Sequence, residues 1–141
     1  MISLIAYRKL IDSVTTHTLR LPDATQGTQA GQELCTLPDG RTVVALFDGF
    51  ALPSDQPEAI AASVETLASP LPTDLRDAIR EASPSVRLIN RRVQAAIAER
   101  YSMADEIKLL RTAPSPEMTT YNAYAEECRA WGRAEKAKLG V

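Results

Sequence analysis

Three helix-start signals follow one another after residue 82, and they constrain the fold more than any other feature of this chain. Ser83-Pro84 is the first, Ser102 with Asp105 three residues later is the second, and Ser115-Pro116 is the third. A serine at the N-cap accepts a hydrogen bond from an unpaired backbone N–H, and proline fits the first helical turn, where its missing N–H costs nothing. The chain from here onwards is therefore predicted to form three consecutive helices.

The apolar residues behind the first and third signals repeat at helical spacing. Behind Pro84 the repeat is Val86, Ile89, Val93 and Ala96 or Ile97, and behind Pro116 it is Met118, Tyr121, Ala125, Cys128 and Trp131 or Gly132. Steps of three and four residues bring side chains to one face of a helix. We predict two long helices, from Pro84 and from Pro116 towards Leu139, which pack as a helical hairpin or small bundle that a neighbouring subunit could complete.

Three shorter helices are also predicted from apolar spacing. Their bounds are Pro57–Leu67, Asp74–Ala82 and Met103–Thr112. Thr73 is the expected N-cap of the second, because its hydroxyl can accept from the first backbone N–H groups. The third is expected to bury Ile107, Leu109 and Leu110 in part.

The N-terminal third carries β-strand patterns, of which a hairpin is the clearest. It joins Glu33–Leu37 to Arg41–Phe47 through Pro38-Asp39-Gly40. Proline presets the turn, glycine takes the left-handed position, and β-branched residues follow in the second strand. The sequence therefore predicts two antiparallel neighbours here.

Weaker patterns predict further strands at Val14–Leu21 and Phe50–Leu52. Residues 1–11 suit a helix and a strand equally, and residues 25–32 read as a polar loop without core positions. We expect an α+β fold, with a small antiparallel β lobe over residues 10–52 and a helical hairpin or small bundle after it. The expected division is 1–53 for the β-rich lobe and 54–141 for the helical region, as one compact unit or two lobes.

The charge of the chain is unevenly divided. Residues 1–74 carry four basic and nine acidic side chains, a net −5, whereas residues 75–141 carry twelve and nine, a net +3. Opposite charges on two halves favour head-to-tail contacts between copies. The basic excess is small and interleaved with acids, so we expect no nucleic-acid partner.

The length and the N-terminus suggest a protein made in, and retained by, a cytoplasm. A chain of 141 residues can bury a core without disulfide or metal staples. No stretch is apolar enough for a bilayer, and the apolar start is followed at once by Arg8-Lys9, the reverse of a secretory signal. We therefore expect no membrane partner.

Few side chains suggest catalysis. His17, the only histidine, stands among threonines, and neither a triad nor a zinc site is indicated around it. Cys35 and Cys128 are interpreted as lone buried thiols. Asp105-Glu106 could be a catalytic carboxylate pair, but a capping and helix-dipole role explains it better. We expect no enzyme activity, no cofactor and no metal.

One helix carries a cluster of arginines. Arg87, Arg91 and Arg92 lie on the polar side of the helix from Pro84. They are either a patch for an acidic partner or an ordinary charged helix face. Arg87 and Arg91 are kept as candidate interface residues.

The C-terminal segments resemble a known group of proteins. They are residues 98–111, with an Arg-Tyr-Ser step into a short helix, and residues 121–132, which end in Cys128-Arg129-Ala130-Trp131-Gly132. Both are similar to the helical region of small tail-associated proteins of tailed bacteriophages and proteobacterial prophages, encoded near tail-fibre or baseplate genes. The hairpin at residues 38–46 and the stretch to Pro57 are similar to the N-terminal half of the same group.

This resemblance implies a non-enzymatic structural component of a phage tail, at the baseplate, tail tip or fibre junction. Such a part is made in the host bacterial cytoplasm, ends in the virion tail, self-associates as a trimer or hexamer-related oligomer, and docks on larger tail, baseplate or fibre proteins. The alternative is a tail-fibre assembly chaperone absent from the mature virion; a small regulatory or antitoxin-like module is a weaker third. Tyr124 and Trp131 are the expected interface anchors, because aromatic side chains supply large contact areas.

Overall fold

The computed structural model describes residues 2–25 and 27–141. It divides into two compact units, which we call the sheet unit (Met1–Ser85 with Lys138–Val141) and the helical unit (Val86–Ala137). The expected division at residues 53 and 54 differs from this one. The helices before residue 85 belong with the sheet, because Ile60 and Ile79 are completely buried there.

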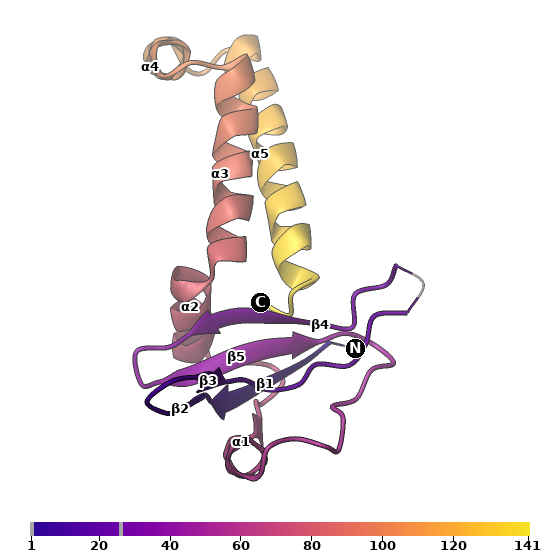
Figure 1. The fold of residues 1–141 in the computed structure, drawn as a ribbon. Helices are drawn as coiled ribbons and strands as arrows, with labels where there is room; N and C mark the ends of the chain where they lie inside the picture. Colours follow the sequence, from indigo (N-terminus) through magenta and orange to yellow (C-terminus); the bar gives the residue numbers. More distant parts are fainter. Residues whose placement is uncertain (1, 26) are drawn as a thin grey trace. The chain divides into compact units, whose positions relative to one another are not determined.

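The sheet unit is built on a four-stranded antiparallel sheet in the order β4-β5-β1-β6. Figure 1 shows β4, β5 and β1 side by side. Its strands are β1 (Ser3–Arg8), β4 (Gly31–Thr36), β5 (Arg41–Leu46) and β6 (Glu65–Thr66). The predicted hairpin is confirmed as β4 and β5, with Gly40 at φ +91° in the turn. Only glycine adopts such a backbone angle without strain, so the turn chemistry read from the sequence holds.

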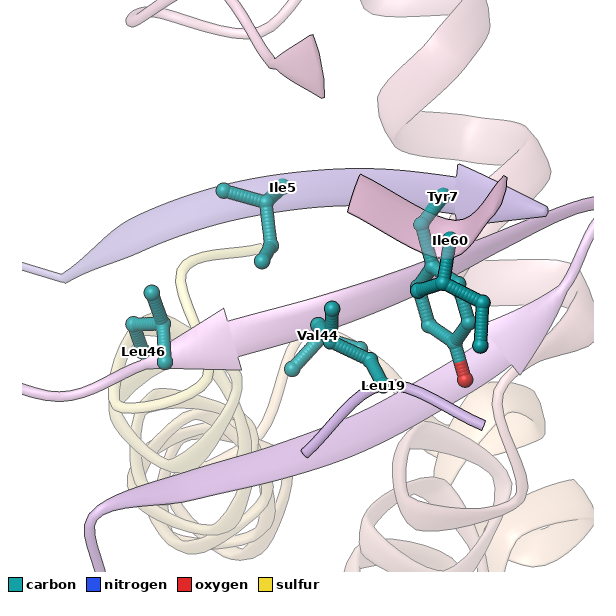
Figure 2. Close-up of a cluster of buried hydrophobic side chains, with 6 residues drawn as sticks. All are labelled: Ile5, Tyr7, Leu19, Val44, Leu46 and Ile60. Atoms are coloured by element: carbon teal, nitrogen blue, oxygen red, sulfur yellow. The ribbon is translucent and has the colours of Figure 1, made fainter. Parts of the chain in front are cut away.

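One face of the sheet carries the core cluster of Figure 2. Alternate residues of β1 and β5 point to this face, as the two-residue period of a strand requires. The cluster consists of Ile5, Tyr7, Leu19, Val44, Leu46 and Ile60. Ile60 comes from α1 (Glu58–Ser63) and Leu19 from the segment before β4, so a helix and a loop together cover this face.

The other face of the sheet is covered as well. Its residues Ala6 and Val43 are completely buried. Helix α2 (Thr73–Ala82) contacts β4. The chain end returns to the same unit, where Arg80 donates hydrogen bonds to the Val141 carbonyl oxygen. Both faces of the sheet are therefore packed within one unit.

The helical unit contains α3 (Pro84–Arg100, from Val86 onwards), α4 (Met103–Thr112) and α5 (Pro116–Ala137). These bounds confirm the helices expected from the start signals. Ser102 accepts from the Asp105 N–H while Asp105 accepts from the Ser102 N–H, a complete capping box, and Ser115 accepts from the Met118 N–H. Side-chain caps of this kind explain why α4 and α5 begin where the sequence predicted.

The predicted α+β class, a β lobe followed by helices, is confirmed. Residues 1–11, for which helix and strand were both open, contain β1 and β2 (Leu10–Ile11). The strand predicted over Val14–Leu21 is wrong except for β3 (Thr16–His17), which pairs with β2. Leu19 turns into the core and the Arg20 N–H binds Gln56, so the chain leaves the strand there.

Three further expectations need correction. The helix predicted to reach Leu67 ends at Ser63, whose hydroxyl donates to the Ile60 carbonyl and accepts from the Arg8 N–H, and β6 follows. Phe50–Leu52 forms no strand, because the turn at Asp48-Gly49 leads into extended chain. Thr73 is not an N-cap but the first helical residue, behind Pro72, which offers no side-chain acceptor.

The polar loop expected at residues 25–32 is confirmed in part. Thr28 donates to the Thr25 carbonyl in a turn, whereas Gln26 lies outside the described residues. Ala30 is buried, and Gly31 already begins β4, so the loop does contribute a core position.

Candidate protein interface

Helices α3 and α5 run antiparallel within the helical unit, side by side in Figure 1. A Cβ on Gly132 would lie 2.6 Å from Val93 Cγ2. Towards the other end of the pair, the Tyr124 hydroxyl donates to the Ala96 carbonyl at 2.9 Å. Residues late in α5 therefore lie beside residues early in α3. Gly132 lets the two helices approach closely, because any side chain there would collide with Val93.

A groove lies along one side of this helix pair. Its rim carries three cations from α5: Arg129, Arg133 and Lys136. Its apolar floor is formed by Val93, Ile97 and Gly132, and Asn90 and Gln94 of α3 add two amides. We call it the basic groove. The arrangement combines cationic and amide donors with an apolar floor, which suits a partner that offers carboxylates around an apolar group.

Helical spacing explains how this groove is assembled. Arg129, Arg133 and Lys136 follow one another at four and three residues, the steps that stack side chains on one face. Arg133 is ion-paired with Glu126 of the same helix, and both side chains are well exposed. A pair exposed to this degree contributes little to stability, so Arg133 can exchange its partner at low cost.

The opposite side of α5 carries a different pattern. Trp131 is 43% exposed, although tryptophan is usually much more buried. Glu127 and Glu135 lie one turn before and after it. We call these three residues the acidic ridge. Successive residues of a helix are rotated by about 100° around its axis, so the side chains of Trp131 and Arg133 point to opposite sides of Gly132.

The four residues predicted for an interface are separated by the structure. Trp131 lies on the acidic ridge, and Arg87 and Arg91 are exposed on α3 but do not line the basic groove. Arg87 also has interactions within the chain. None of the four predicted residues therefore lines the basic groove.

Tyr124 occupies the space between the helices. Besides its bond to Ala96, its ring lies 4.6 Å from the Arg100 guanidinium carbon and 6.0 Å from the Tyr101 ring. A hydrogen bond with Cys128, followed by burial, raises the pKa of the Tyr124 phenol. Tyr124 therefore connects α3 and α5. Its side chain is half-buried, so only part of its surface is open to a partner.

Helix α4 presents a third surface. Met103 is 78% exposed and Leu110 is 65% exposed, and Ile107 between them is also exposed. The expectation that Ile107 and Leu110 are partly buried is therefore wrong; only Leu109 of the three is half-buried. The Tyr121 hydroxyl donates to Glu106 at 3.0 Å and ties α4 to α5 on its other side. We call Met103, Ile107 and Leu110 the α4 apolar face.

The chemistry-bearing groups outside the helical unit have local roles. His17 lies 3.0 Å from Asp12 in the exposed β2–β3 turn, and backbone N–H groups of Val14 and Thr15 lower the Asp12 pKa to about 2. Burial raises the pKa of the Cys35 thiol to about 11, which keeps it protonated at neutral pH. Among the described residues, no three His, Cys, Asp or Glu side chains gather as a metal site would require.

Sequence reasoning missed the basic groove and the α4 apolar face. The spacing of Arg129, Arg133 and Lys136 was a usable signal, since it repeats on the side of α5 away from Trp131. The Gly132–Val93 contact determines which α3 residues lie opposite these cations, and the sequence does not reveal that contact.

Comparison of the chain with protein-family models, with curated proteins and with solved structures found no match. In the part of the chain that the structure describes, no helix combines the length and the apolar character needed to cross a membrane.

Proposed function

We propose that this chain is a non-enzymatic structural component of a bacteriophage tail, at the baseplate, tail tip or fibre junction. It acts by self-association and by docking to a larger tail protein. The C-terminal motifs that resemble small tail-associated proteins support the tail assignment, and the exposed surfaces of the helical unit support the docking role.

The observation that carries the proposal is the α4 apolar face. Helix α4 has no buried residue, yet a complete capping box and the Tyr121–Glu106 bond hold it in a defined position. Ordered helices that keep a row of large apolar side chains in water are typical of docking elements.

We propose as partner a larger tail protein with an apolar groove that accepts one short helix. Met103, Ile107 and Leu110 follow the spacing of four and three residues with which a helix anchors itself in such a groove. A helix of ten residues spans only about 15 Å. One α4 contact is therefore weak by itself, and docking gains strength when several copies bind together.

Quantitative mass spectrometry of purified particles tests the proposal directly. The expected result is this chain in a fixed ratio to the tail-tip proteins, near a multiple of three or six. A chain that is abundant in the lysate but missing from finished particles would overturn the structural role and favour the assembly chaperone. Particles with normal tails from a strain that lacks the chain would overturn both.

A variant pair assigns the docking to α4. Leu110→Lys places a charge at one end of the α4 apolar face and is expected to remove the chain from particles, with an unchanged thermal melt of the isolated protein. Thr112→Lys adds the same charge on the opposite side of α4 and is expected to be incorporated normally. Equal incorporation of both variants would show that α4 is not the docking element.

A further inference from the structure

We infer that the basic groove of one copy receives the acidic ridge of a second copy. This contact deepens the self-association in the proposed function and rests on it. Its test needs only the purified chain, so a failure here can be told apart from a failure of the tail assignment.

The groove and the ridge are chemically complementary. The groove offers Arg129, Arg133 and Lys136 around an apolar floor. The ridge offers an exposed indole between two carboxylates. With Trp131 on the floor of the groove, the carboxylate of Glu127 can meet Arg129 on its rim. Glu135 and Lys136 lie near the other end of the contact and also have interactions within their own chain. Arginine and tryptophan are also the side chains that most often dominate binding energy at protein interfaces.

The spacing of the charges matches along the helix axis. At a rise of about 1.5 Å per residue, Glu127 and Glu135 are ~12 Å apart and Arg129 and Lys136 are ~10.5 Å apart. Flexible side chains cover the remaining difference. The spacing therefore lets Glu127 lie opposite Arg129 while Glu135 lies near Lys136, and the first of these pairs carries the contact because Glu135 and Lys136 also interact within their own chain.

The contact is smaller than a standard interface. The groove spans only about 10.5 Å of the roughly 33 Å length of α5, whereas a standard interface buries about 800 Å² on each partner. We expect a moderate affinity that falls with ionic strength, because exposed charges contribute much of the contact.

The position of the two surfaces determines the kind of assembly. Groove and ridge lie on opposite sides of α5, so a contact between them is heterologous and leaves one free groove and one free ridge on every pair. Such contacts close into rings or grow as filaments. A ring agrees with the trimer or hexamer-related oligomer that the resemblance implies. An isologous dimer does not agree with that oligomer, because it would pair the same surface of both copies.

The test uses the full-length chain with one variant for each surface. Arg129→Glu reverses a charge of the groove, and Trp131→Ala removes the centre of the ridge. Sedimentation velocity over a concentration series is expected to show oligomers larger than a dimer for the parent protein. Each variant alone is expected to weaken the contact by about tenfold or more, which leaves mainly monomers. Lys108→Glu, the same charge reversal on α4, is expected to assemble like the parent.

Mixing the two variants separates this contact from the alternatives. Arg129→Glu keeps an intact ridge and Trp131→Ala keeps an intact groove, so an equal mixture is expected to form heterodimers and nothing larger. A chain with both Arg129→Glu and Glu127→Arg exchanges the charges of the contact and is expected to regain assembly in part.

Three outcomes would overturn the inference. They are a parent protein that stays monomeric at all concentrations, parent-like oligomers in both single variants, and a mixture without heterodimers. A monomeric parent whose groove binds a synthetic acidic peptide with a central tryptophan would assign the groove to another protein instead.

Discussion

The two units of this protein use their apolar residues in opposite ways. Of the twenty buried hydrophobic residues in the described chain, sixteen belong to the sheet unit and four to the helical unit. The helical unit exposes Trp131, Leu88 and the α4 apolar face, whereas the large apolar residues that the sheet unit exposes, Leu10, Ile11 and Val14, are confined to the β2–β3 hairpin. A unit that covers its apolar surface internally is stable by itself, whereas a helix pair with large exposed side chains gains more from partners. The comparison places the core in one unit and the candidate interface in the other.

The largest expected effect is at the core of the sheet unit. Ile60→Ala removes a completely buried side chain from the cluster of Figure 2 and is expected to lower the free energy of unfolding by about 2–5 kcal/mol. Ile11→Ala makes the same change at a position that is 75% exposed, and is expected to stay within ~0.5 kcal/mol of the parent. Urea unfolding of both variants measures the contrast. Similar losses at the two positions would contradict the packing described for β1, β5 and α1.

A smaller effect is expected at the contact between α3 and α5. Gly132→Ala places a methyl group 2.6 Å from Val93 Cγ2, and the strain is expected to cost about 1–3 kcal/mol despite the better helix propensity of alanine. Hydrogen exchange should show the loss in α3 and α5, with β1 and β5 unaffected. Val93→Ala in the same chain removes the colliding methyl groups and is expected to restore most of the protection. If the double variant were as weakened as the single one, this contact would not be the cause.

Local signals in the sequence were sufficient for part of this fold. The starts of α3, α4 and α5 depend on a serine or proline next to the helix, and the β4–β5 turn depends on Gly40. Interactions between neighbouring residues determine such features, so the sequence reveals them. The pairing of β1 with β6 could not be found in this way. It joins Ile5 to Thr66, and a strand of two residues has no pattern of its own.

The same distinction applies to the candidate interface. The type of residue pointed to Trp131, whose side chain is exposed, and its interface role stays a prediction. Periodicity showed that α4 has an apolar face, but not that this face lacks a neighbour within the described chain, which depends on the whole tertiary arrangement. The basic groove depends on the register of α3 against α5, which the missing side chain of Gly132 makes possible.

The cap of α4 gives a third and smaller effect. Helix α4 buries no side chain, so the hydrogen bonds at its start contribute a large share of its stability. Ser102→Ala is expected to cost α4 about 1 kcal/mol, seen as faster amide exchange between Met103 and Thr112. Ser115→Ala removes the matching cap of α5 and is expected to leave α4 exchange unchanged. If Ser102→Ala also left it unchanged, tertiary contacts rather than the cap would hold α4.

The smallest expected effect is confined to the β2–β3 turn of the sheet unit, whose residues are exposed like those of α4. The N–H groups of Val14 and Thr15 and the His17 ring bind the Asp12 carboxylate and lower its pKa to about 2 from about 3.8. A lowered folded pKa means that this stabilisation is complete above about pH 4 and is lost as the pH falls through about 2. The amide NMR shifts of Val14 and Thr15 should therefore change with a midpoint near pH 2.

Asp12→Asn is the control for that titration, because an amide oxygen can still accept from both N–H groups but carries no proton that titrates. The turn of this variant is expected to keep its shape, and the pH-dependent shift should disappear. The β1 and β5 amides should not respond in either protein, since the turn lies outside the core cluster. A midpoint near pH 4 would mean that the turn does not hold the carboxylate. A response that spread into β1 would mean that the exposed turn and the buried sheet are coupled. That result would contradict the contrast between the buried core and the exposed surfaces, on which both proposals depend.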